Sequence, residues 1–142
     1  MENIYAVKTE AQTKKIAGDF AKTLKGGEVI LLSGDLGAGK TFFVQAAAKA
    51  LGVKEQVTSP TFILMQIYKA SRNKIKNVCH IDAYRLGCVK EFEASGLDEC
   101  LYRDDTVSFI EWGEKVKTLM RGAIEINIEI KENERVITID KN

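Results

Sequence analysis

Residues 34–41 read Gly-Asp-Leu-Gly-Ala-Gly-Lys-Thr and match the phosphate-binding pattern GxxxxGK[ST] at every fixed position. In such a loop the backbone N–H groups surround a β-phosphate, the lysine contacts the β- and γ-phosphates, and the hydroxyl after it ligates Mg²⁺. The loop therefore predicts a Mg²⁺-dependent site for ATP or ADP, with Lys40 as its catalytic cation. The residues that we expect to contact the nucleotide in this segment are Asp35, Leu36, Gly37, Ala38, Gly39, Lys40, Thr41 and Phe42.

Two acidic residues follow apolar segments and could complete this site. Glu111 comes directly after the run Val-Ser-Phe-Ile at residues 107–110, and Asp82 lies in the segment His-Ile-Asp-Ala-Tyr-Arg at residues 80–85. Ligands of open α/β sheets bind at the carboxyl ends of the strands, so both carboxylates could reach the same phosphate and its metal. We expect both to be catalytic acids of the nucleotide site. The alternatives are a solvated carboxylate for Glu111 and a locally hydrogen-bonded side chain for Asp82.

Three further residues give weaker signals. Thr61 follows a Ser-Pro pair, where its hydroxyl could reach the metal or the γ-phosphate from a switch-like loop; a plain proline turn explains the segment equally well. Trp112 could contact a partner protein or pack in the core. His80, the only histidine, could carry a proton, although a structural hydrogen bond is the more common role.

The hydrophobic pattern predicts the elements that must position these residues. They are, in order, a helix at residues 9–25 with a capping box of Thr9 and Gln12, a buried strand at 28–33, a helix from the loop to about 51, a strand pair at 62–69 and 74–82, short helices within 91–103, a buried strand at 106–110, a short helix at 114–120, and a hairpin of 123–131 with 134–140. These elements predict an α/β fold of the three-layer P-loop NTPase type, with a mixed sheet of parallel core strands and antiparallel hairpins flanked by helices.

Composition narrows the classes of protein and partner. A chain of 142 residues with 45% hydrophobic content has the size of a single domain, which we expect to span residues 1–142. Lys+Arg 21 against Asp+Glu 20 leaves no overall charge that would indicate nucleic acid or an anionic membrane. The three cysteines, Cys79, Cys88 and Cys100, lack a CxxC spacing, so we expect neither a disulfide framework nor a zinc site. With no signal peptide and no membrane-spanning apolar stretch in the sequence, we expect a cytoplasmic protein.

Four motifs in this order resemble the TsaE (YjeE) family of bacterial ATPases. They are GDLGAGKT at residues 34–41, SPTF at 59–62, HIDAYRL at 80–86 and IEWGEK at 110–115. The resemblance covers essentially the whole chain. It implies an accessory subunit that acts with the TsaB and TsaD proteins to make N6-threonylcarbamoyladenosine next to the anticodon of tRNA. It also implies that ATP binding and slow hydrolysis support turnover of the complex, while TsaD performs the transfer and contact with tRNA is indirect.

The same resemblance implies roles for individual residues. Thr41 and Glu111 resemble the Mg²⁺ ligands, and Asp82 resembles an essential acid at the metal and the γ-phosphate. Trp112 resembles a required aromatic residue beside the metal ligand, which we expect to couple the nucleotide state to a partner. Thr9, at the start of the N-terminal helix, is our candidate for the adenine pocket, although a capping threonine needs no ligand to explain it.

Two positions depart from the family pattern. Phe42 stands where a second threonine is usual, which removes a hydroxyl near the phosphates. Gly113 stands where proline or serine is frequent, so we expect a more mobile turn after Trp112.

Two functions from other classes remain as alternatives. A small-molecule P-loop kinase would share the phosphate loop, but such kinases generally add a lid that carries arginines. No such segment is evident after Thr61, and Arg85 and Arg103 alone are weak support. A nucleotide-sensing switch would bind ATP or ADP and regulate partners without turnover.

Overall fold

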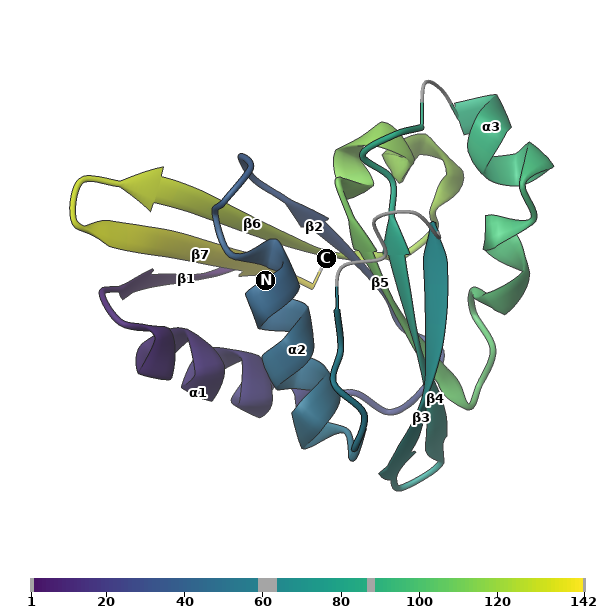
Figure 1. Cartoon of the computed structure of the whole chain (residues 1–142), viewed down its shortest axis with the longest axis horizontal. Coiled ribbons are helices and arrows are strands. Elements are labelled where there is room, and N and C mark those ends of the chain that lie inside the picture. The colour runs from purple at the N-terminus through teal and green to yellow at the C-terminus, as the bar shows by residue number, and fades with distance from the viewer. Residues whose placement is uncertain (1, 59–63, 87–88, 142) are drawn as a thin grey trace.

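The computed structural model describes residues 2–58, 64–86 and 89–141, which form a seven-stranded sheet flanked by helices (Figure 1). The strands are β1 (Glu2–Val7), β2 (Val29–Ser33), β3 (Met65–Arg72), β4 (Ile75–Asp82), β5 (Thr106–Glu111), β6 (Ile124–Lys131) and β7 (Glu134–Asp140). The helices are α1 (Glu10–Ala21), α2 (Lys40–Ala50) and α3 (Val89–Ala94), with 3₁₀ helices η1 (Leu97–Cys100), η2 (Gly113–Lys115) and η3 (Lys117–Leu119).

The sheet has parallel strands at its centre and antiparallel strands at both edges. Its order is β1-β7-β6-β2-β5-β4-β3, in which β2 pairs in parallel with β5 and β6, and β4 pairs in parallel with β5. Strands β2 and β5 are buried on both faces, apart from a half-buried Ser33, as their continuous apolar runs predict. The predicted mixed α/β fold is confirmed.

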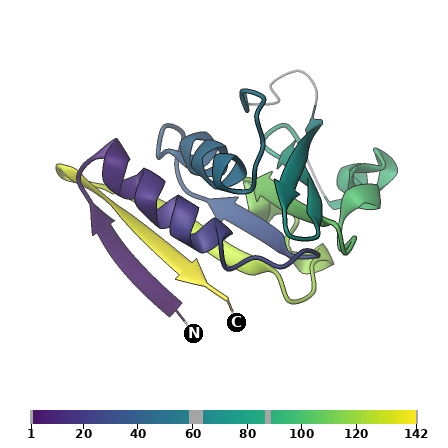
Figure 2. The ribbon, with the colours of Figure 1, turned by 90° about the horizontal axis from the view of Figure 1, so that it is seen from below.

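Apolar residues on the two faces of the sheet belong to separate clusters. On one face Ile30, Leu32 and Phe109 pack with helices α1 and α2, which lie side by side in Figure 2. On the other face Leu31 and Ile110 pack with residues from α3 and the 3₁₀ helices. Successive residues of β2 therefore point to opposite layers, because side chains alternate along a strand. This sandwich fixes the central strands and hence the side chains at their ends.

The predicted capping box is present at the start of α1. Thr9 Oγ1 accepts a hydrogen bond from Gln12 N at 3.2 Å, and Gln12 Oε1 accepts one from Thr9 N at 3.1 Å. The helix ends at Ala21, four residues before the predicted end. The N–H groups of Thr23 and Leu24 bond to the carbonyl oxygens of Phe20 and Ala21, three residues back, so the α-helical pattern of four-residue bonds does not continue. The predicted hairpin is present, but its first strand, β3, runs from Met65 to Arg72, three residues beyond the predicted end at residue 69. The turn lies at Asn73, with φ of 53°, and Lys74. The predicted strand residues 62 and 63 lie outside the described residues.

The sequence prediction was wrong or incomplete in two further segments. It missed β1, in which five of six residues are exposed and which is defined by its pairing with β7. Residues 114–120 form the 3₁₀ helices η2 and η3 rather than one α-helix, because the backbone bonds from Val116 and Leu119 span three residues instead of four. In the described parts of the chain, no helix is long and apolar enough to span a membrane.

Candidate functional site

The carboxyl ends of three neighbouring strands meet at one edge of the sheet, next to the phosphate loop. Strand β2 leads into the loop, β5 ends at Glu111, and β4 ends at Asp82. Glu111 is the register partner of Asp82 on one side and of Leu32 on the other. The two acids predicted from the sequence are thus brought together beside the loop, at the edge where open α/β sheets bind ligands.

A hollow of about 400 Å³ lies at this edge, and we call it the phosphate hollow. It is lined by residues of the loop, of α2 and of both strand ends. They are Leu36, Gly37, Gly39, Lys40, Thr41, Phe42, Asp82, Tyr84, Arg85, Glu111 and Trp112. Most of the residues predicted for the nucleotide site therefore face one space. Thr61 and the motif at residues 59–62 lie outside the described residues.

Glu111 is held by two side chains at the base of the phosphate hollow. Its Oε1 and Oε2 each lie 2.9 Å from Thr41 Oγ1, and His80 Nε2 donates to Oε2 at 2.5 Å. Glu111 is 4% exposed and His80 is fully buried. A buried carboxylate is tolerated when it is hydrogen-bonded, and here its partners also fix its direction. The two residues that the resemblance names as Mg²⁺ ligands thus lie in contact, and Glu111 is not a solvated carboxylate.

His80 is a residue of the site whose role the sequence left open. It precedes Asp82 by two positions on β4, so the alternation of side chains places both on the same face. The alternation does not predict that Glu111 on β5 is the hydrogen-bond partner of His80, because the pairing of β4 with β5 is set by the tertiary fold. The hydrogen bond expected for a structural histidine is present, and through it the His80 side chain orients Glu111.

Lys40 is the first residue of α2 and points back across the loop. Its Nζ donates to the carbonyl oxygens of Gly34 at 2.6 Å and Asp35 at 3.0 Å, and it lies 4.1 Å from the centre of the Trp112 ring. Burial lowers the pKa of the Lys40 ammonium, against the opposing effect of nearby carboxylates, first among them Glu111. A phosphate at this position would supply negative charge in place of the loop carbonyls.

Backbone geometry explains how the loop presents its N–H groups. Gly34 has φ of 137°, and a Cβ at this position would lie 2.3 Å from the carbonyl oxygen of Ile128, so only glycine fits. Gly39 precedes α2 and supplies no side chain to cap it. The first N–H groups of the helix are therefore available to an anion, and the helix dipole favours negative charge there.

Asp82 lines the phosphate hollow and also makes a local hydrogen bond. Its Oδ1 accepts a bond from Tyr84 N at 2.9 Å, and the side chain is half-buried. The local bond named as the alternative is present, and the side chain nevertheless lines the phosphate hollow. Asp82, Glu111 and the Thr41 hydroxyl are oxygen donors, which Mg²⁺ prefers.

The described residues contain no group of three or more His, Cys, Asp or Glu side chains arranged to hold a metal ion. Mg²⁺ is usually bound by one or two protein oxygens together with phosphates and water. The Thr41 hydroxyl and the Glu111 carboxylate, which are in contact, offer oxygens of this kind.

Trp112 lies between the loop lysine and the rim of the hollow. It is half-buried, has φ of 60°, and its ring lies 4.9 Å from the ring of Tyr84. Lys115 Nζ donates to the carbonyl oxygens of Tyr84 at 2.5 Å and Leu86 at 3.3 Å, which ties this rim to η2. The aromatic rim therefore contacts both Lys40 and the segment that follows Asp82. Its role toward a partner remains a prediction.

The two departures from the family pattern have different structural settings. Phe42 lies on the first turn of α2 and lines the phosphate hollow. Gly113 is buried, and a Cβ there would lie 2.5 Å from Leu31 Cβ, so the close approach of η2 to β2 requires glycine. This reason for a glycine was not visible in the sequence, and the mobility expected for the turn remains a prediction.

Arg85 was given little weight in the sequence analysis, yet it lines the phosphate hollow. The other arginine considered there, Arg103, donates from Nε to the carbonyl oxygen of Glu99 at 3.2 Å and does not line the hollow. The sequence feature that could have predicted Arg85 as a residue of this site is its position in the motif HIDAYRL, three residues after Asp82.

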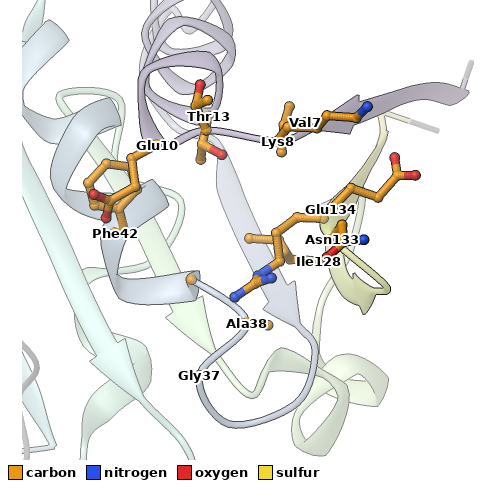
Figure 3. Close-up of a pocket in the computed structure, with 13 residues that line it drawn as sticks. Val7, Lys8, Glu10, Thr13, Gly37, Ala38, Phe42, Ile128, Asn133 and Glu134 are labelled. Carbon is orange, nitrogen blue, oxygen red and sulfur yellow. The ribbon is translucent and has the colours of Figure 1, made fainter.

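A second hollow of about 250 Å³ lies on the opposite side of the phosphate loop, and we call it the hairpin hollow. Figure 3 shows residues of the α1 start, the loop and the β6–β7 hairpin around it, among them Thr13, Phe42 and Ile128. The rest of its polar lining consists of Lys8, Thr9, Glu10, Asn133, Glu134 and Arg135. Thr9 thus borders a space next to the loop while its hydroxyl also caps α1.

Comparisons with known proteins agree with these motifs. The family described as "Threonylcarbamoyl adenosine biosynthesis protein TsaE" matches residues 7–137. The tRNA threonylcarbamoyladenosine biosynthesis protein TsaE of Aquifex aeolicus is 41% identical over 136 residues, covering 94% of this chain and 92% of the relative. The protein of the same name from Rickettsia conorii is 39% identical over 142 residues, covering 98% of this chain and 78% of the relative. The crystal structure of YdiB from Bacillus subtilis has a TM-score of 0.80 and 28% identity, covering 100% of this chain and 87% of YdiB. The chain therefore belongs to the TsaE family of threonylcarbamoyl adenosine biosynthesis proteins.

Proposed function

We propose that the chain binds Mg·ATP at the phosphate loop, hydrolyses it slowly, and thereby supports tRNA threonylcarbamoyladenosine formation together with the TsaB and TsaD proteins. Membership of the family supports the pathway. The nucleotide role is carried by one observation: Thr41, the last residue of the loop pattern, hydrogen-bonds both oxygens of Glu111 at the end of β5. This pairing of a loop hydroxyl with a strand-end carboxylate is what a Mg²⁺–nucleotide site of this fold needs.

In this proposal, different residues of the phosphate hollow bind the phosphates, hold Mg²⁺ and orient the attacking water. Lys40 and the N–H groups at the start of α2 hold the phosphates by charge and by hydrogen bonds. Thr41 and Glu111 would hold Mg²⁺, and His80 keeps the carboxylate turned toward Thr41. Bound Mg²⁺ supplies positive charge that offsets the charge developing on the transferred phosphoryl group. Asp82, beside Glu111, orients the attacking water.

The hairpin hollow accommodates the base and ribose in this proposal. It shares Gly37, Gly39 and Phe42 with the phosphate hollow, so a nucleotide that passes over the loop can enter both. Arg135 offers a flat cation that can stack on a base. Thr9 lies at the hollow with its hydroxyl engaged in the cap, so we assign it a role in shape rather than in hydrogen bonding to the base.

Trp112 couples the nucleotide to a partner protein in this proposal. Its ring contacts both Lys40 and the ring of Tyr84, and Tyr84 is 50% exposed. A movement of Lys40 when the phosphates change can therefore be passed to the outer surface through the contacts Lys40–Trp112 and Trp112–Tyr84.

A small-molecule kinase is the second candidate, and the observation that favours it is Arg85 in the phosphate hollow. Kinases of this fold use arginines to stabilise the transferred phosphoryl group. A nucleotide switch without turnover would use the same binding residues, so only turnover separates it from the first proposal.

The deciding experiment combines the protein with TsaB, TsaD, tRNA, ATP and threonylcarbamoyl-adenylate, and measures modified nucleoside and ADP over several turnovers. We expect modification beyond one turnover with this chain, and none beyond one turnover when it is omitted or replaced by Lys40→Ala. Equal modification without the chain would contradict the proposal. Rapid phosphorylation of an added small-molecule acceptor would favour the kinase.

A further inference from the structure

Two cysteines that are distant in the sequence are in contact on the face of the sheet that packs against α3 and η1. Cys79 is on β4 and Cys100 is at the end of η1, 21 residues later, and their Sγ atoms are 2.6 Å apart. Both thiols are free; Cys79 is fully buried and Cys100 is 8% exposed. The separation of the sulfur atoms is shorter than an ordinary van der Waals contact, so only a small approach would be needed to bond them.

The two cysteines are surrounded by apolar side chains and by the sulfur atom of a methionine. Both cysteines belong to the cluster that packs α3 and η1 against the sheet, and Cys100 Sγ lies 3.7 Å from Met65 Sδ. Buried cysteines often serve only as small apolar side chains, and packing alone would explain either one. Packing alone does not explain why the two thiols point at one another from different layers of the fold.

The two thiols are chemically unequal. The hydrogen bond from Cys79 lowers the pKa of the Cys100 thiol, and nearby Arg103 acts in the same direction, whereas burial opposes them. The hydrogen bond with Cys100 and burial raise the pKa of Cys79. Cys100 is also the more exposed of the two. Since the thiolate is the nucleophile in thiol oxidation, Cys100 is the one that reacts first.

The chain between the two cysteines carries part of the phosphate hollow. Asp82, Tyr84 and Arg85 all lie between residues 79 and 100. A bond between the two sulfurs would close this segment into a loop and tie β4 to η1.

We propose that Cys79 and Cys100 form a redox-modification site that reacts with a hydroperoxide and closes to an intramolecular disulfide. The Cys100 thiolate attacks one peroxide oxygen, the O–O bond breaks, and the leaving oxygen takes a proton, which gives a sulfenic acid on Cys100. The Cys79 sulfur then attacks Cys100 Sγ, the S–O bond breaks, and the hydroxide leaves as water with the Cys79 proton. The two thiols lose two electrons and the peroxide gains them. A dithiol reductant reverses the reaction.

The test treats the folded protein with hydrogen peroxide, blocks free thiols with iodoacetamide, and analyses intact mass and peptides without reduction. We expect a loss of two hydrogen atoms and a crosslinked peptide pair containing Cys79 and Cys100. The variant Cys88→Ser is the matched control and should crosslink at the wild-type rate. Crosslinks that join Cys88 instead, or the absence of a Cys79–Cys100 crosslink when peroxide has oxidised the thiols, would overturn the proposal.

Two further readouts separate this site from a passive pair. In Cys79→Ser the reaction should stop at a sulfenic acid on Cys100, which dimedone traps, and Cys79→Ala serves if the serine variant does not fold. The crosslink should raise the thermal midpoint of the wild-type protein by about 5–10 °C, reversibly with dithiothreitol, because a closed loop restricts the unfolded chain. An unchanged or lowered midpoint would show that the folded chain does not accommodate the bond.

Discussion

The two hollows on either side of the phosphate loop are built in different ways. The phosphate hollow is lined by motif residues at the ends of parallel strands, whereas the hairpin hollow is lined by the α1 start and the antiparallel β6–β7 hairpin. In the first, Glu111 and Lys40 are buried and their polar atoms are paired. In the second, Arg135 and Glu134 are half-buried and Lys8 is exposed. Under the proposed function, the chemistry would be fixed by side chains of the sheet core, while the base would be recognised by a more exposed surface.

The largest effect is expected at the acids of the phosphate hollow. Glu111→Gln and Asp82→Asn should each lower the rate of Mg²⁺-dependent ATP hydrolysis by at least about a hundredfold, because the first weakens the hold on Mg²⁺ and the second removes the carboxylate that orients the attacking water. The rate of ADP formation measures this, with Glu129→Gln on β6 as a control that keeps the wild-type rate. A variant with wild-type hydrolysis would remove that acid from the site.

Lys40→Ala should weaken ATP binding about tenfold to a hundredfold, since a hydrogen bond to a charged group is typically worth about 1.5–3 kcal/mol. Calorimetric titration measures the affinity. Lys49→Ala, an exposed residue in the last turn of the same helix, is the matched control. Undiminished affinity of Lys40→Ala would contradict the assignment of the phosphate hollow.

His80→Leu should destabilise the fold by about 1–3 kcal/mol, because it leaves the buried Glu111 carboxylate without one of its two partners. His80→Gln retains an N–H donor and should recover part of the loss. Urea unfolding of both variants measures the difference. Equal stability of the two would mean that the hydrogen bond to Glu111 contributes nothing.

Arg135→Ala probes the other hollow and should have a smaller effect. We expect ATP affinity to fall about twofold to tenfold, as for loss of a cation stacked on a ring, while tripolyphosphate affinity stays unchanged. Arg121→Ala, which lines neither hollow, is the control. A parallel loss of tripolyphosphate affinity would place Arg135 at the phosphates and remove the contrast between the two hollows.

Trp112→Ala should change nucleotide affinity least, within about threefold, because its contact with Lys40 is only one cation–π interaction. It should nevertheless abolish support of tRNA modification in the reconstituted system, and Trp112→Phe should retain much of it. Full modification activity of Trp112→Ala would return this residue to ordinary packing.

The phosphate hollow was largely predictable from the sequence, and the hairpin hollow was not. The apolar runs that precede the phosphate loop and Glu111 predict that each follows a strand or ends one. The alternation of side chains in β4 predicts that His80 and Asp82 share one face. Arg135 carries no such signal, because its position depends on the pairing of β7 with β1 and β6. The meeting of Cys79 with Cys100 was likewise hidden, since a separation of 21 residues through helices and turns does not fix a distance.

The contact between Thr41 and Glu111 is tested most directly by the effect of Mg²⁺ on ATP affinity. Calorimetry would compare the wild-type protein and Glu111→Gln, each with Mg²⁺ and with a chelator. We predict that Mg²⁺ tightens ATP binding to the wild type by at least about tenfold, equivalent to 1.4 kcal/mol, and that most of this gain is lost in the variant while its Mg²⁺-free affinity is retained. The same gain from Mg²⁺ in both proteins would contradict the account.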